Sequence, residues 1–433
     1  MPPATDPWPA PRATAPVDAV VTVPGSKSVT NRALVLAALA DGPSRLRDPL
    51  RARDTLLMAG ALRALGVGVA DDGDDWVVTP APLRGPATVD VGLAGTVQRF
   101  VPPLAALAAG PVRFDGDPRA RERPLAPQLA GLRALGAQVD DGGRGALPLT
   151  VHGTGRLRGG DARVDASASS QFVSGLLLAA PRYDEGIRLR HDGPGPVPSA
   201  PQVRMTVHML RDAGGEVSDH DGREWTVAPG RLAGRDLAVP PDLSTAAPFV
   251  VAAVATGGRV RVRGWPRRGD QPGDRLPELL ARMGASCVLD GDGLTTTAGD
   301  RLDGLDADLA DCTELVPALV ALAALARTPS TFHGIGHMRG QETDRLAALA
   351  TELTRLGGEV TESADGLRIV PRPLRGGTVR TYDDHRIAMF GAVLGLAVDG
   401  VEVADVASTG KTVPDFVERW ARMLGATSAA VAP

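Results

Sequence analysis

Lysine, arginine and hydroxyl side chains gather in short motifs at the start of apolar segments. Lys27 and Arg32 lie in PGSKSVTNR, Arg99 lies in LAGTVQRF and Arg386 lies in YDDHRIAM. The apolar residues after each motif predict a buried helix, so each cation lies at a helix N-terminus. A cation there opposes the positive end of the helix dipole unless an anion lies between it and the free N–H groups. The pattern therefore predicts a site for a polyanionic small molecule.

Ordinary structural roles explain part of this pattern. Ser28, Thr96 and Ser244 have the side chains that are typical of helix N-caps and could be explained in that way, since an N-cap accepts hydrogen bonds from the first N–H groups. The arginine-rich loops GDPRARERP (116–124) and GHMRGQETDRL (336–346) are compatible with solvated faces or ion-pair networks. Guanidinium groups also bind carboxylate and phosphate through paired hydrogen bonds. Both interpretations of these loops stay open at the level of sequence.

The two lysines are a second signal for chemistry. Lys27 and Lys411 are the only lysines among 47 Lys and Arg residues. GC-rich coding explains a general excess of arginine, and on that interpretation the two lysines are leftovers. An ammonium group, however, can shift its pKa and pass a proton, whereas a guanidinium group stays charged. We therefore expect both lysines to take part in binding or proton transfer.

Composition and motifs exclude several classes of protein. The net charge of −4 argues against a nucleic-acid partner, and no apolar run reaches the ~18 residues that a membrane span needs. Cys287 and Cys312 cannot form a disulfide framework, and they fit the reducing cytoplasm. The scattered histidines indicate no zinc site, and GSKS lacks the first glycine of a P-loop. The Pro- and Ala-rich residues 1–16 predict a disordered tail.

An internal repeat predicts the elements that position the motifs. Amphipathic helices of the type LRALGVGV end at six similar glycines: Gly66, Gly136, Gly214, Gly284, Gly357 and Gly425. A glycine after a helix indicates a left-handed C-cap, and the valines after it indicate a strand. Nearly all-apolar segments, from RALVLAALA to RIAMFGAVLGLAV, alternate with these helices and predict helices that are buried on all sides.

The spacing of the glycines, 68 to 78 residues, predicts six α/β units with three in each of two domains. The segment RLAGRDLAVPP (231–241) is the expected boundary between the domains. The alternative is a single long α/β fold in which the periodicity is accidental.

Eight motifs resemble the 5-enolpyruvylshikimate-3-phosphate (EPSP) synthase family, in order from about residue 20 to about residue 420. They are PGSKSVTNRALVLAALADG, LAGTVQRFVPP, GDPRARERP, DASASSQFVSGLLLAAP, PDLSTAAPF, ETDRLAALATELTRLGGEV, YDDHRIAM and STGKTVPDF. The resemblance implies a two-domain inside-out α/β barrel, the enolpyruvyl transferase fold, built from six βαβαββ units with three per domain. It places the first domain at residues 25–238 and the second at residues 17–24 plus 239–433.

The resemblance also implies an activity. The family transfers the enolpyruvyl group of phosphoenolpyruvate to the 5-hydroxyl of shikimate 3-phosphate and releases phosphate, a step of the shikimate pathway toward chorismate and the aromatic amino acids. It uses no metal and no organic cofactor. Both substrates are polyanions, in agreement with the helix N-terminus argument. We accordingly expect a cytoplasmic, monomeric 3-phosphoshikimate 1-carboxyvinyltransferase with these two substrates as its partners.

Residue by residue, the resemblance implies three overlapping sets. The catalytic set is Glu314, which would remove the proton of the 5-hydroxyl, with Lys27, Glu342 and His337. The shikimate 3-phosphate set is Lys27, Ser28, Arg32, Ser169, Ser170, Gln171, Ser199, Glu314, His337 and Gln341. The phosphoenolpyruvate set is Lys27, Gly95, Arg119, Gln171, Arg345, Arg386 and Lys411.

Several residues depart from the family pattern. Leu93 replaces a polar residue, Gln202 replaces an aromatic one, and His337 and Gln341 stand where Asn and Lys are usual. Because Gln341 removes a cation, the proton donor is either His337 or one of the two lysines. The nearest rival family, UDP-N-acetylglucosamine enolpyruvyl transferase, carries a reactive cysteine in the loop that reads GDPRARERP here, and this loop has none.

Overall fold

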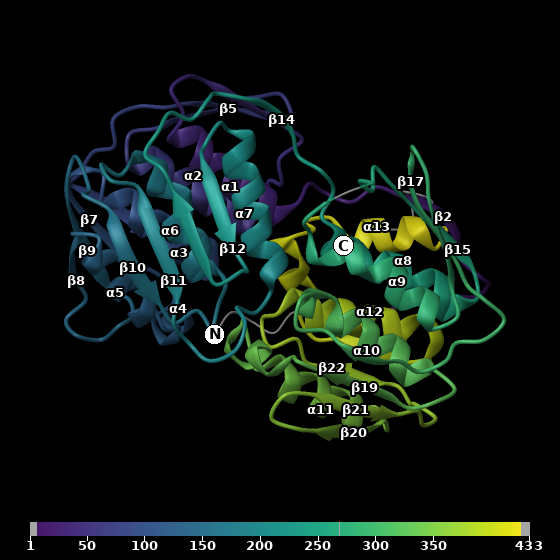
Figure 1. Ribbon diagram of the computed structural model, residues 1–433. Coiled ribbons are helices and arrows are strands. Elements are labelled where there is room, and N and C mark those ends of the chain that lie inside the picture. The colour runs from purple at the N-terminus through teal and green to yellow at the C-terminus, as the bar shows by residue number, and fades with distance from the viewer. Residues whose placement is uncertain (1–6, 268, 426–433) are drawn as a thin grey trace. The chain divides into compact units, whose positions relative to one another are not determined.

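The computed structural model describes residues 7–267 and 269–425 (Figure 1). The described residues divide into two compact units. The first unit comprises residues 25–239, and the second comprises the described residues up to Pro24 together with those from Pro240 onward. Among the described residues, no helix combines the length and the apolar character needed to cross a membrane.

The first unit contains three four-stranded sheets, in the strand orders β6-β7-β9-β8, β10-β11-β13-β12 and β14-β3-β5-β4. Its strands are β3 (Ser44–Arg47), β4 (Gly68–Asp72), β5 (Asp75–Thr79), β6 (Ala87–Asp90), β7 (Ala109–Asp115), β8 (Gln138–Asp140), β9 (Leu149–Thr154), β10 (Gly160–Val164), β11 (Ile187–His191), β12 (Val217–His220), β13 (Glu224–Val227) and β14 (Asp236–Ala238). Its helices are α1 (Lys27–Ala38), α2 (Arg53–Ala64), α3 (Gly95–Ala105), α4 (Pro118–Glu122), α5 (Ala126–Ala134), α6 (Gln171–Ala179), the 3-10 turn η1 (Ala180–Arg182) and α7 (Ala200–Asp212).

The second unit contains two four-stranded sheets, β16-β17-β15-β2 and β18-β19-β21-β20, and the three-stranded sheet β1-β23-β22. Its strands are β1 (Trp8–Pro9), β2 (Asp18–Val21), β15 (Arg259–Arg263), β16 (Ser286–Leu289), β17 (Gly293–Thr297), β18 (Asp306–Asp308), β19 (Ser330–His333), β20 (Glu359–Glu362), β21 (Leu367–Val370), β22 (Gly377–Val379) and β23 (Val401–Val403). Its helices are α8 (Leu243–Thr256), η2 (Pro272–Arg275), α9 (Leu276–Arg282), η3 (Thr313–Leu315), α10 (Val316–Leu325), η4 (Gly336–Gly340), α11 (Arg345–Arg355), α12 (His385–Ala397), η5 (Val406–Lys411) and α13 (Phe416–Met423).

The four-stranded sheets share one topology. In each, a parallel pair of strands, such as β6 and β7, is extended by an antiparallel hairpin, such as β8 and β9. A parallel pair needs a crossover connection, and α3 supplies it between β6 and β7. The amphipathic helix α5 then leads into the hairpin, so the chain follows the order β-α-β-α-β-β that the sequence predicts.

The two kinds of helix that the sequence predicts are confirmed. The apolar segments form α1, α3 and α6 in the first unit and α8, α10 and α12 in the second, and these helices are almost wholly buried. All six glycines after the amphipathic helices have positive φ, between 85° for Gly425 and 101° for Gly284. This left-handed conformation is the expected C-cap.

Within each unit the buried helices pack against one another and bring their N-termini together. In the first unit, Asn31 of α1 donates a hydrogen bond to Thr96 of α3 at 2.9 Å. In the second unit, the Arg386 side chain at the start of α12 donates to the carbonyl of Ser244 at the start of α8 and to that of Glu314 just before α10. The motifs before these helices, far apart in sequence, therefore lie side by side.

The expected disordered tail is wrong for the part that the structure describes. Residues 1–6 lie outside the described residues, but Trp8 and Pro9 form strand β1, which pairs antiparallel with β23. Ala10 donates its N–H to the carbonyl of Val401, and the Trp8 ring packs edge-on against Phe416 with centroids 6.3 Å apart. The Pro/Ala-rich composition is misleading because a few tertiary contacts outweigh a weak local propensity.

Candidate active site

In the first unit, Lys27 begins α1 and points at a buried carboxylate. Its Nζ atom lies 3.3 Å from Asp54 Oδ2, and the Asp54 side chain is only 7% exposed. Arg53 contacts the other oxygen of Asp54 at 3.1 Å. Asp54 lies in the first turn of α2, where an acid is ordinary, so sequence reasoning did not single it out. Its ion pair with Lys27 fixes the direction of the ammonium group.

Arg32 is buried one turn further along α1. Its Nε donates to the Thr206 hydroxyl at 2.7 Å and its Nη2 to the Gln202 carbonyl at 2.9 Å. The guanidinium also lies 5.3 Å from the centre of the Phe100 ring, which gives a cation–π contact. Because α1, α3 and α7 all contact it, Arg32 is a rigid positive charge in a low-dielectric environment. Such a charge favours an anionic ligand.

Two further guanidinium groups lie against Gly95 at the start of α3. A Cβ atom on Gly95 would lie 2.9 Å from Arg99 Nη1 and 3.0 Å from both Nη atoms of Arg123. Burial and the nearby Arg123 charge lower the pKa of Arg99. Among the described residues, the buried Nε of Arg99 and the buried Oε1 of Gln171 have no hydrogen-bond partner. Two like charges at a helix N-terminus favour an anion.

Arg119, also implied by the resemblance, lies half-buried on the short helix α4.

The candidate serine residues of the first unit lie at the starts of three helices. Ser170 is the N-cap of α6, and the Ser169 hydroxyl accepts a hydrogen bond from the Gln171 N–H at 3.3 Å. Ser199 precedes α7 and has left-handed dihedral angles, φ 50° and ψ 45°. The Ser28 carbonyl accepts a hydrogen bond from Arg32. Serine hydroxyls at helix N-termini are suitable donors for a phosphate group.

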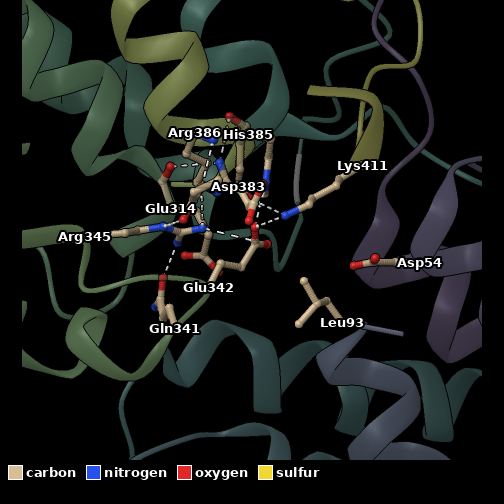
Figure 2. Close-up of polar contacts among 12 residues, drawn as sticks. Asp54, Leu93, Glu314, Gln341, Glu342, Arg345, Asp383, His385, Arg386 and Lys411 are labelled. Carbon is tan, nitrogen blue, oxygen red and sulfur yellow. Dashed lines mark hydrogen bonds and ion pairs between the residues drawn. The ribbon is translucent and has the colours of Figure 1, made fainter. Parts of the chain in front are cut away.

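In the second unit, Arg345 is held on two sides (Figure 2). Its Nε and Nη2 atoms donate to the two oxygens of Asp384 at 2.7 and 3.1 Å. Its Nη1 atom donates to Oε1 of Gln341, and the Gln341 amide contacts the Thr313 hydroxyl at 3.4 Å. The Arg345 side chain is 4% exposed and Asp384 is fully buried. Burial opposes the charge of Arg345, but Asp384 and Glu342 outweigh it and raise the pKa.

Arg386 and Glu314 form the next contact of this cluster (Figure 2). Arg386 donates to the backbone carbonyl of Glu314 at 2.9 Å, and its own N–H is capped by Asp384 at 2.9 Å. Burial and the neighbouring Arg345 lower the pKa of Arg386, against the effect of Glu314. The Glu314 carboxylate is close enough to Arg345 and Arg386 to favour the charge of both guanidinium groups.

Glu342 links the second lysine to a histidine (Figure 2). Its Oε2 atom lies 3.2 Å from Lys411 Nζ and 3.3 Å from His385 Nδ1. Lys411 is 6% exposed and also donates to the Asp383 carbonyl. An acid, a histidine and an ammonium group in direct contact can share and move a proton.

Glu342, Asp384 and His385 also have the residue types of a metal site, with ligand atoms within 4.8 Å of one another. However, Lys411 contacts the Glu342 oxygen and Arg345 occupies both oxygens of Asp384. A divalent cation would have to displace these positive charges. We interpret the cluster as an ion-pair network.

Comparison with known proteins identifies the family. The sequence-family model for EPSP synthase (3-phosphoshikimate 1-carboxyvinyltransferase) matches residues 11–420 of this chain. A 3-phosphoshikimate 1-carboxyvinyltransferase from Kocuria rhizophila is 54% identical over 431 residues, which cover 97% of each chain. The chain belongs to the EPSP synthase family. Two solved structures of EPSP synthase from Acinetobacter baumannii match the fold with TM-scores of 0.80 and 0.78, at 26% and 25% identity. Both cover 96% of this chain and 97% of theirs.

The family resemblance drawn from sequence is thereby confirmed, as is the two-domain α/β fold of EPSP synthases. Within the first unit the structure brings Arg32 close to Ser28 and places Gly95 against Arg99 and Arg123. Within the second it joins the following residues in one network of contacts through Asp384: Glu314, Gln341, Glu342, Arg345, Arg386 and Lys411. Sequence reasoning missed Asp54, whose role depends on a partner 27 residues away.

Proposed function

We propose that the residues described above carry out enolpyruvyl transfer from phosphoenolpyruvate to the 5-hydroxyl of shikimate 3-phosphate. The observation that carries this proposal is the set of buried cations in each unit: Arg32 and Arg99 near the starts of α1 and α3, and Arg345, Arg386 and Lys411 in the network around Glu342 and Asp384. Arg386 also contacts the backbone carbonyl of Glu314. Such a set suits two small polyanions that react with each other. Family membership defines the reaction, and the contacts support the roles assigned to individual residues.

Shikimate 3-phosphate is bound, in this proposal, mainly by the first unit. Ser169, Ser170 and Ser199 hold its phosphate, since their hydroxyls lie at the starts of α6 and α7. Arg32 binds its carboxylate, with Ser28 and Gln171 nearby. By the family resemblance, Glu314, His337 and Gln341 belong to the same set. The rigid contacts of Arg32 reduce the entropy that is lost on binding.

In this proposal, phosphoenolpyruvate is bound by the set of residues that the family resemblance implies. Gly95 lets the backbone of α3 approach the ligand, and Lys27 and Gln171 contact both substrates. Arg345, Arg386 and Lys411 supply positive charge from the second unit. The role of Arg119 in binding phosphoenolpyruvate stays a prediction. We add Arg123 to the residues that bind phosphoenolpyruvate, because the Arg123 guanidinium lies against Gly95.

The reaction needs one base and one acid. Glu314 takes the proton of the 5-hydroxyl as that oxygen bonds to C2 of phosphoenolpyruvate, and a proton is added at C3. The tetrahedral intermediate then loses a proton from C3 and releases phosphate. Lys27 and Glu342 are the groups that we assign to the transfers at C3. The fixed cations stabilise the charge of the intermediate, because they need no reorganisation when it forms.

A phosphate-release assay with two acceptors tests the proposal. With phosphoenolpyruvate present, shikimate 3-phosphate should support turnover and UDP-N-acetylglucosamine should not. Turnover with UDP-N-acetylglucosamine but not with shikimate 3-phosphate would overturn the assignment of the acceptor. It would leave phosphoenolpyruvate as the donor.

Replacing Gly95 with alanine should weaken phosphoenolpyruvate binding. The new Cβ would press on the ends of Arg99 and Arg123, which are flexible enough to move, so the variant should fold. The displaced guanidinium groups would then be misplaced for the donor, and KM for phosphoenolpyruvate should rise about tenfold. Gly60→Ala is the matched control, because nothing outside the nearby backbone of its own helix and its chain neighbours lies within 4 Å of the added Cβ. Equal KM values for the two variants would contradict the expected role of Gly95.

His337, expected as a catalytic residue, should be a neutral imidazole at neutral pH. Burial lowers its pKa, although Glu314, Asp365 and Asp311 act in the opposite direction. A lowered pKa means that the ring gains its proton only below the ordinary value of about 6.5. A neutral ring binds substrate but is a weak acid, which favours Lys27 as the proton donor. An NMR titration, assigned with His337→Gln, should show a midpoint below about 6.5, and a higher midpoint would restore the acid role.

We also propose that the enzyme works as a cytoplasmic monomer. Cys287 and Cys312 are both free thiols, which fits a reducing compartment. All of the residues proposed for the reaction come from one chain, so the chemistry requires no second copy.

A further inference from the structure

Glu352 is a buried carboxylate outside the candidate active site. It lies on α11, two turns beyond Arg345, and its side chain is fully buried. Its Oε1 atom accepts a hydrogen bond from the Tyr382 hydroxyl at 2.6 Å, and its Oε2 atom accepts one from the Arg380 N–H at 3.0 Å. Arg355, on the same helix, donates to both oxygens at 3.1 and 3.2 Å. Burying a charge is costly unless it is paired in this way. The loss of any of these contacts should therefore destabilise the folded protein.

The residue that Glu352 holds belongs to an unusual turn. Tyr382 and Asp383 both have positive φ, 55° and 56°. Single non-glycine residues visit this left-handed region at some energetic cost, and two in succession need support from their surroundings. Burial and the bond to Glu352 raise the pKa of Tyr382, so its hydroxyl stays protonated and remains a donor.

The turn leads directly into the phosphoenolpyruvate side of the proposed site (Figure 2). The Asp383 carbonyl accepts a hydrogen bond from Lys411. Asp384 follows, binds Arg345 through both oxygens and caps the N–H of Arg386. The Asp383 carbonyl therefore holds Lys411, and the Asp384 carboxylate holds Arg345 and the first turn of the helix that carries Arg386.

Helix α11 meets this turn at two points. Arg345 at its start holds Asp384, and Glu352 further along holds Tyr382 and the Arg380 N–H. With one contact alone, the turn could rotate about it. With both, the direction of the Asp383 carbonyl and of the Asp384 carboxylate is fixed relative to α11.

We propose that Glu352 is a positioning residue for phosphoenolpyruvate binding, which acts through Tyr382 to hold residues 382–384 in the conformation that directs Lys411, Arg345 and Arg386. This inference rests on the proposed function. Glu352 itself contacts no substrate. Its removal should therefore change the affinity for the donor more than the chemical step.

Tyr382→Phe is the sharpest test, because it removes one hydroxyl and keeps the ring. The loss of a hydrogen bond to a charged group should raise KM for phosphoenolpyruvate about tenfold, with kcat lowered by less than about threefold. The Kd for shikimate 3-phosphate should not change. Glu352→Gln should shift the same parameter in the same direction.

Arg355→Gln is the matched control. It removes two hydrogen bonds from the same carboxylate, but Arg355 does not belong to the turn. This variant should lower Tm without a change in KM for phosphoenolpyruvate. A similar KM increase in Arg355→Gln, or an unchanged KM in Tyr382→Phe, would reduce Glu352 to a purely structural role and overturn the inference.

Amide hydrogen exchange gives a readout that does not depend on activity. Residues 382–387 should exchange faster in Tyr382→Phe than in the wild type, whereas Arg355→Gln should leave them protected. An inactive wild-type enzyme would refute the proposed function, and exchange would still test the turn. The wild type could instead be active while Tyr382→Phe keeps the wild-type KM for phosphoenolpyruvate and the wild-type amide exchange of residues 382–387. That result would refute this inference and leave the proposed function intact.

Discussion

Glu314→Gln should lower turnover by about 10²–10⁴-fold while shikimate 3-phosphate binds nearly as well as before. The amide keeps the shape of the side chain but cannot accept the proton of the 5-hydroxyl. The local structure should persist, because Arg386 donates a hydrogen bond to the backbone carbonyl of Glu314, which the substitution keeps. Steady-state kcat and calorimetric binding of shikimate 3-phosphate measure the two effects separately.

Asp242 supplies the comparison for this experiment. It precedes the buried helix α8, as Glu314 precedes α10, but its Oδ1 atom accepts the Thr245 N–H at 2.9 Å as an N-cap. Asparagine also caps helices, so Asp242→Asn should keep most of the turnover. Near-normal turnover of Glu314→Gln together with an inactive Asp242→Asn would place the base at Asp242.

Lys27→Arg should lose most of its turnover, by about 10²-fold, and remain folded. A guanidinium is wider than an ammonium group and does not become neutral, so it cannot replace Lys27 beside Asp54 or pass a proton. Steady-state kinetics, with circular dichroism as a folding control, measure the effect.

Lys411→Arg is the contrasting variant. Because Lys411 is paired with Glu342 and the Asp383 carbonyl, we expect it mainly to bind an anion. Its replacement should raise KM for phosphoenolpyruvate more than it lowers kcat. Wild-type kinetics in both lysine variants would mean that the two lysines are accidents of codon usage.

Much of the fold follows from local sequence patterns. The glycine C-caps, such as Gly66 and Gly357, depend only on the end of one helix, and all of them have the expected positive φ. The buried helices follow equally directly, because a segment that is apolar on every side has no face to expose to water. Strand β1 could not be predicted from local sequence, because Trp8 pairs with Val403, which lies near the opposite end of the chain.

The site follows from sequence only in part. Cations at helix N-termini, such as Arg32 and Arg386, indicate an anion because their position conflicts with the helix dipole. By contrast, nothing in the run GDPRARERP distinguishes Arg119 from Arg123, and the structure is needed to show that Arg123 lies against Gly95. Glu352 was missed for a similar reason, because an acid in the middle of an amphipathic helix reads as a solvated residue until its partner Tyr382 is known.

The most direct test of the central claim is to follow both substrates and both products by ³¹P NMR. With phosphoenolpyruvate and shikimate 3-phosphate together, the enzyme should form inorganic phosphate and 5-enolpyruvylshikimate 3-phosphate in equal amounts, and neither substrate alone should be consumed. Phosphate released from phosphoenolpyruvate without consumption of shikimate 3-phosphate, or no reaction of the complete mixture, would contradict the account.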